Sequence, residues 1–224
     1  MSAAPAFAAV PASRRALDPT ERMSEVLFGV IMALTFTGTI SAASAGREAI
    51  REILVGALGC NIAWGLVDAV MYLLNTLTQR ARGLLLTRRV HDARDHAAAR
   101  GIIADALPET LAAVIRPEEL ERFRRAVAGL DNLPARARLG WQDYKGAIGV
   151  FLLVAVSTFP LVIPFLVMQE PVRALRVSHA IGLTLLFLVG HTLGRHSGQG
   201  PWRMGLSMVG IGVLLVGLTI ALGG

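Results

Sequence analysis

The chain is organised around long apolar stretches that contain almost no charged residue. A helix that crosses a bilayer needs about 20 mainly apolar residues. None of these stretches has the polar stripe at every third or fourth position that a helix of a soluble bundle carries. The pattern therefore predicts an all-α integral membrane protein with five transmembrane helices. Their predicted limits are Val26–Ala45, Ile53–Leu77, Gly146–Met168, Val177–Gly194 and Met204–Gly224.

The segment between the second and third apolar stretches has a different pattern, with many arginines and only a thin apolar face. We expect Gln79–Arg100 to continue the second crossing beyond the membrane, and Gly101 to end that helix. A short helix over Ile102–Ile115 is expected next. Pro117 followed by two glutamates is a typical helix start and predicts a third helix to Ala128. The sequence thus predicts a short three-helix insert between transmembrane helices 2 and 3.

These elements predict four regions along the chain. Residues 1–20 are rich in alanine and proline, lack the charge order of a secretory signal, and are expected to form a flexible tail. Residues 21–77 hold the first two crossings and residues 141–224 the last three. Residues 78–140 form the helical insert, which is small enough that formation of a homodimer would help to stabilise it.

The distribution of charged residues mainly predicts how the chain is oriented in the membrane. The chain has 22 basic and 16 acidic residues, a net charge of +6, and thirteen of its basic residues lie between Thr76 and Lys145. The positive-inside rule then places the N-terminus and residues 78–140 in the cytoplasm and the C-terminus outside. The preference for arginine over lysine suggests a GC-rich bacterial genome. We therefore expect the protein in a bacterial inner membrane. The basic segment is expected to contact anionic lipid headgroups and not nucleic acid, because no aromatic residues alternate with its arginines.

Acidic side chains inside apolar stretches are the first candidates for chemistry, because burying a charge in lipid is costly. Asp68 is the only charged residue of the second stretch and shares a helix face with Asn61 and Asn75. On the first stretch, Glu25, Met32 and Thr39 have the same seven-residue spacing. We expect these polar faces of the first two crossings to contact each other or to line a cavity, because neither can face lipid.

Carboxylate oxygen and thioether sulfur together favour a divalent transition metal such as iron. The candidate ligands are Glu25, Asp68, Met71 and Met32. The alternative is that Asp68 is protonated or hydrogen-bonded between helices, and that both methionines only fill space.

Two groups in the insert are further metal candidates. Asp92, Asp95 and His96 have helical spacing, and Glu118 and Glu121 lie one turn apart. The alternative is a set of i,i+4 ion pairs such as Glu121 with Arg125.

Enzyme signatures are absent from the sequence: it has no His-Glu-x-x-His, Gly-x-Ser-x-Gly or glycine-rich phosphate loop. We therefore expect that the protein is not an enzyme and holds no permanent cofactor. His191 and His196 leave a membrane-embedded hydrolase as a third hypothesis, behind a transporter and behind a non-transporting membrane scaffold or regulator.

Three local motifs, in the same order and topology, resemble the vacuolar iron transporter (VIT) family. They are Val67–Met71 in the second crossing, Phe159–Phe165 with its paired prolines in the third, and Arg203-Met204 before the spaced glycines of the fifth. The resemblance implies a homodimer, joined through its transmembrane helices, that exports ferrous iron, or manganese, in exchange for protons. It implies pathway ligands at Glu25, Asp68 and Met71, and cytoplasmic metal-collecting glutamates at Glu118, Glu121 and Glu109.

Overall fold

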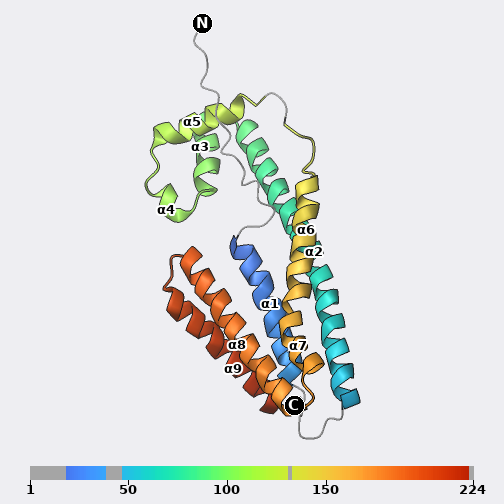
Figure 1. The fold of residues 1–224 in the computed structure, drawn as a ribbon. Helices are drawn as coiled ribbons and strands as arrows, with labels where there is room; N and C mark the ends of the chain where they lie inside the picture. The colour runs from blue at the N-terminus through green and yellow to red at the C-terminus, as the bar shows by residue number, and fades with distance from the viewer. Residues whose placement is uncertain (1–18, 39–46, 131–132, 222–224) are drawn as a thin grey trace. The chain divides into compact units, whose positions relative to one another are not determined.

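The computed structural model describes residues 19–38, 47–130 and 133–221, and all regular secondary structure within them is helical (Figure 1). The predicted tail, apart from its last two residues, lies outside the described residues. The helices are α1 (Pro19–Gly38), α2 (Arg47–His91), α3 (His96–Asp105), α4 (Glu109–Ala112), α5 (Pro117–Ala128), α6 (Trp141–Ser157), α7 (Phe159–Val167), α8 (Pro171–His196) and α9 (Pro201–Ala221).

The chain divides into two compact units. The first contains the described residues up to Tyr72 and from Gln142 onward, and the second is Leu73–Trp141. The first unit holds most of the apolar sequence, and the second holds the arginine-rich segment. We call them the membrane unit and the insert unit.

Four helical stretches are long and apolar enough to span a membrane: Ile50–His91, Trp141–Val167, Pro171–His196 and Pro201–Thr219. The protein is therefore a multi-pass membrane protein. The predicted first crossing corresponds to α1, and its last residues lie outside the described part of the chain. The count of five crossings stays a prediction.

The core of the membrane unit forms where α1, α7 and α8 meet. Val30 and Leu34 of α1 are fully buried against Leu161 of α7 and Leu186 of α8. Glycines allow this close approach, as is usual between membrane helices. A Cβ at Gly182 would lie only 2.5 Å from Leu34 Cδ2.

The predicted third crossing is interrupted. Gly146–Met168 was expected as one helix, but α6 ends at Ser157 and α7 begins at Phe159. Pro160 lies four residues after Val156 and has no N–H to donate to its carbonyl, and its ring disfavours a regular helix. Helical hydrogen bonding begins again in α7, where Leu161 N and Val162 N both donate to the Thr158 carbonyl, at 3.1 and 3.3 Å.

In the insert unit, only the helix predicted from Pro117 to Ala128 has the expected limits. The helix expected over Ile102–Ile115 is wrong, because α3 already ends at Asp105 and the separate α4 covers Glu109–Ala112. The helix that leaves the second crossing ends at His91 and not near Arg100, because the Asp95 side chain accepts from Ala98 N at 2.7 Å and starts α3. Gly101 lies inside α3. The helix expected from Pro117 to Ala128 is α5, and it packs on α3.

Candidate functional site

A buried polar centre lies where α1, α2 and the α6–α7 interruption meet. Asn61 of α2 is 1% exposed, and its Nδ2 donates to Thr158 Oγ1 and, more weakly, to Gly29 O of α1 at 3.5 Å. Thr158 is fully buried, and Ser157 beside it donates to Val154 O at 2.8 Å. Three segments that are distant in sequence therefore place uncharged polar groups at one point of an apolar unit.

This centre has an acceptor without a donor. Among the described residues no group donates to Asn61 Oδ1, although the atom is fully buried. A buried carbonyl left in this way costs about 1–3 kcal/mol. An amide oxygen is a suitable partner for a water molecule or for a hydrated or partly dehydrated cation.

One hydrogen bond connects the two helices that carry the predicted polar faces, from Asn61 Nδ2 of α2 to Gly29 O of α1. Gly29, whose carbonyl accepts from Asn61, lies one turn after Glu25 and three residues before Met32, so these three residues share a face of α1. Glu25 and Met32 are both partly buried, and Glu25 interacts with a neighbouring group. Thr39, on the same predicted face, lies outside the described residues.

Asp68 lies on the face of α2 that carries Asn61. Gly65, between them, faces α6, because a Cβ there would lie 3.1 Å from Phe151 O. Asp68 itself is partly buried. At 1.5 Å per residue it lies about 10 Å along the helix from Asn61. The third predicted member of this face, Asn75, is exposed and belongs to the insert unit.

Glu25 and Asp68 lie on the same side of the polar centre. In Figure 1, α1 and α2 run in opposite directions within the membrane unit. Glu25 precedes the contact residue Gly29 on α1, and Asp68 follows the contact residue Asn61 on α2. Both acids are therefore displaced toward the same end of the helices, by about 6 Å and about 10 Å respectively.

Met71 lies one turn beyond Asp68, where this face of α2 borders the exposed side of the helix. Its side chain is 49% exposed and is flanked by the equally exposed Val67, Val70 and Leu74. Within one copy of the chain it therefore faces outward, toward lipid or another protein surface. Its role as a metal ligand stays a prediction.

A cleft beside Ser157 is unsuited to a metal ion. It has a volume of about 570 Å³, lies between α1, α6 and α8, and reaches Ser157. Its charged lining residues are Arg22 and Lys145, and most of the remaining lining is apolar. Cationic side chains repel a divalent cation, so the acids and the polar centre are the better candidates.

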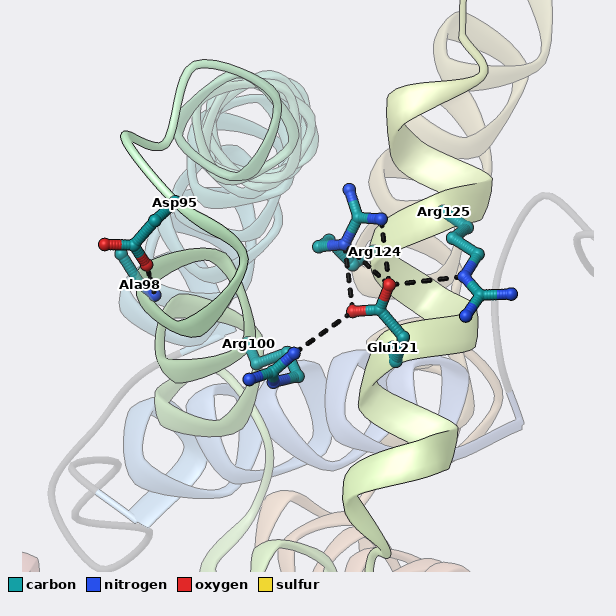
Figure 2. A network of polar contacts seen from close by, with 6 residues as sticks. All are labelled: Asp95, Ala98, Arg100, Glu121, Arg124 and Arg125. Carbon is teal, nitrogen blue, oxygen red and sulfur yellow. Dashed lines mark hydrogen bonds and ion pairs between the residues drawn. The ribbon is translucent and has the colours of Figure 1, made fainter.

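In the insert unit, Glu121 is surrounded by arginines. Figure 2 shows its carboxylate between Arg124 and Arg125 of α5 and Arg100 of α3, and the shortest contact is 2.8 Å from Arg124 Nη2. Hydrogen bonds from Arg124, supported by those from Arg125 and Arg100, lower the pKa of Glu121 to about 2. The predicted pair of Glu121 with Arg125 is confirmed, at 3.2 Å. The structure thus shows Glu121 as a link between α3 and α5.

The other predicted ligands of the insert unit are dispersed. Glu118 and Glu109 are exposed at the starts of α5 and α4. Asp92 contacts His91 at 3.0 Å, and the helical spacing expected for Asp92, Asp95 and His96 is wrong, because α2 ends before them. In the described part of the chain, no three His, Cys, Asp or Glu side chains gather as a metal site would require.

The sequence interpretation missed Ser157 and Thr158. Small hydroxyl residues are common in membrane helices, and nothing local distinguishes these two. The available signal was their position just before Pro160, because a proline frees a carbonyl that polar neighbours then have to satisfy.

The histidines of the hydrolase hypothesis have structural contacts. The ring of His191 packs against Trp202 and Phe187, with centroids 5.7 and 5.9 Å apart. The Nδ1 atom of His196 lies 2.9 Å from Thr192 O.

Comparison with known proteins gives the family. No curated protein matched the chain. A family model described as the VIT family matches residues 85–224, which include most of the insert unit and α6 to α9. Glu25, Asn61, Asp68 and Met71 all lie before the matched region, so the match does not bear on these residues. Because it covers more than half of the 224 residues, the chain belongs to the VIT family.

Proposed function

We propose that this protein transports a divalent metal ion, ferrous iron or manganese, out of the cytoplasm in exchange for protons. The observation that carries the proposal is the polar centre at Asn61, with Glu25 and Asp68 displaced to one side of it. A transport path through an apolar bundle needs polar groups at successive depths and irregular backbone only where it is enclosed by protein. Family membership supports the same function.

In this mechanism the carboxylates exchange an ion for protons. Glu25 and Asp68 bind the cation after it loses part of its water shell, and protonation of either acid weakens the site and releases the ion. The amide of Asn61 provides a neutral oxygen farther along the same path. Softer ligands, Met32 and Met71, would favour iron over magnesium or calcium.

A homodimer fits the exposure of Met71. The outward face of α2 that carries Met71 is apolar and unpacked within one copy. A second copy on this face would turn Met71 from a lipid-facing side chain into an enclosed one. The proposed dimer therefore pairs through the transmembrane helices.

The test is ferrous-iron uptake into liposomes that contain the purified protein, with and without a pH gradient. We expect Asp68→Asn to abolish uptake, because an amide cannot neutralise the cation or exchange a proton. The matched control is Asp105→Asn, the same change at an exposed residue of α3, which should retain wild-type uptake. Glu118→Gln combined with Glu121→Gln should weaken uptake only partly.

Two results would contradict the proposal. Wild-type flux in the Asp68→Asn protein would remove this residue from the path. If the wild-type protein shows no flux above protein-free liposomes with iron or with manganese, the protein is a membrane scaffold or regulator that keeps the family fold.

A further inference from the structure

The insert unit contains a basic cavity that the transport proposal does not use. Its volume is about 540 Å³, and its walls are the stretch of α2 around Arg80 and Leu84 and the segment 134–138. The charged lining residues are Arg80, Arg136 and Arg138, and the others are leucine, proline and alanine. Within the described ranges no acidic residue lines the cavity, so its lining suits an anion.

Hydrogen bonds from α2 hold the second wall in place. Arg80 Nη1 donates to Arg138 O at 2.8 Å. Arg88 Nη2 donates to Pro134 O at 2.6 Å and to Ala135 O at 2.8 Å. These are backbone carbonyls, which do not neutralise a guanidinium group. The segment 134–138 is therefore fixed on α2 through its backbone, and these bonds do not use the side chains of Arg136 and Arg138.

Arg136 and Arg138 are the two cationic side chains that this cavity offers to a ligand. Both side chains are exposed, and neither forms an ion pair with a described residue. Guanidinium groups in this state bind phosphate oxygens well, because their planar N–H groups match two oxygens at once.

The sequence positions of both walls indicate which phosphate is available. Arg80 follows the last residue of the predicted second crossing, Leu77, by three positions. Arg138 precedes the span Trp141–Val167 by three positions, and Trp141 is 68% exposed, as is typical of an aromatic residue at a membrane interface. Both walls of the cavity thus adjoin membrane-spanning sequence, where lipid phosphates are concentrated.

We propose that this cavity binds the phosphate group of an anionic phospholipid. Arg136 and Arg138 provide the charge, Arg80 and Arg88 hold the wall that carries them, and Leu84 with the alanines contacts the apolar part of the headgroup region. Basic pockets next to membrane helices commonly bind such headgroups. The site is independent of the transported ion.

The experiment titrates the full-length protein, in a neutral detergent, with phosphatidylglycerol or phosphatidylcholine and counts retained lipids by native mass spectrometry. We expect retention of phosphatidylglycerol only. Arg136→Gln with Arg138→Gln should weaken it roughly 10-fold or more. Arg136→Lys with Arg138→Lys keeps the charge but loses the bidentate geometry, so it should bind the lipid more tightly than the glutamine variant and less tightly than the wild type. Lipid binding by the lysine variant shows that loss in the glutamine variant reflects charge and not misfolding.

The matched control is Arg116→Gln with Arg122→Gln, which removes the same charge from exposed arginines outside the cavity. Equal loss of lipid in this control and in the cavity variant would overturn the proposal, as would equal retention of phosphatidylcholine. A third arm adds inorganic phosphate. Displacement of the lipid at equal concentration would assign the cavity to a soluble phosphate and overturn the lipid as its ligand.

Discussion

The substitution Asn61→Leu tests whether the polar centre serves transport or only joins the helices. The two side chains branch at the same atom, so leucine removes the amide while keeping its outline. Loss of the bond to Thr158 costs about 0.6 kcal/mol on average and at most about 1.7 kcal/mol for a hydrogen bond between membrane helices. Removal of the buried Oδ1, which has no donor among the described residues, raises the free energy of unfolding by about 1–3 kcal/mol. The free energy of unfolding should therefore lie between about 1 kcal/mol below and about 2 kcal/mol above that of the wild type.

Transport should respond differently, because leucine offers no oxygen to a passing cation. We expect iron uptake into liposomes to fall at least about tenfold, on the scale of the loss of one well-placed polar contact. Unfolding is measured in mixed micelles by raising the fraction of sodium dodecyl sulfate. The control is Thr37→Val, since Thr37 is equally buried but donates only within its own helix, to Ala33 O at 2.9 Å.

The reasoning would be refuted by either measurement. Uptake within about twofold of the wild type would show that the centre only joins helices. A loss of more than about 3 kcal/mol in the free energy of unfolding would show that the Asn61–Thr158 bond is far stronger than membrane hydrogen bonds generally are. Addition of Thr158→Ala to Asn61→Leu makes room for the leucine and shows whether crowding causes such a loss.

Two further predictions concern stability. Gly182→Ala should lower the free energy of unfolding by about 1–3 kcal/mol, because the new Cβ would lie 2.5 Å from the buried Leu34. Gly210→Ala, with open space around it, should change this free energy by less than about 0.5 kcal/mol. Equal effects of the two variants in the same micelle titration would contradict the packing described for α1 and α8. The pKa of Glu121 is lowered from 4.5 to about 2, so its ion pairs stabilise the docking of α3 on α5 above pH 4.5 and are lost as the pH falls toward 2. Hydrogen exchange of α3 and α5, corrected for its intrinsic pH dependence, should rise in that range in the wild type and not in Glu121→Gln.

The sequence predicted the apolar helices well because length and hydropathy alone determine them. The structure has helices over the apolar cores of all the predicted crossings that it describes, and α5 has the predicted limits, since a proline start and a glycine end are local signals. The interruption at Thr158 was harder to predict, because membrane helices often tolerate proline without breaking.

The errors arose where side chains compete with the backbone or where contacts are distant. The residues around Asp95 have helical spacing, but the aspartate side chain binds a backbone N–H and starts a new helix instead. The contact between Asn61 and Thr158 joins residues 97 positions apart. Nothing in either local sequence indicates it. The pairing of Glu121 with Arg125 is local and was predictable, whereas its contact with Arg100 depends on how α3 packs on α5.

The charges that surround the candidate metal ligands differ between the insert unit and the membrane unit. At Glu121 a divalent cation would compete with three guanidinium groups that already donate to both carboxylate oxygens. The polar centre in the membrane unit has neutral oxygens, with Glu25 and Asp68 on one side of it. Two carboxylates balance a charge of +2 in a medium of low dielectric constant, where an uncompensated ion would be excluded. Replacement of the ion by protons keeps the same balance, so in the proposed mechanism proton exchange follows from the charge that the site has to neutralise.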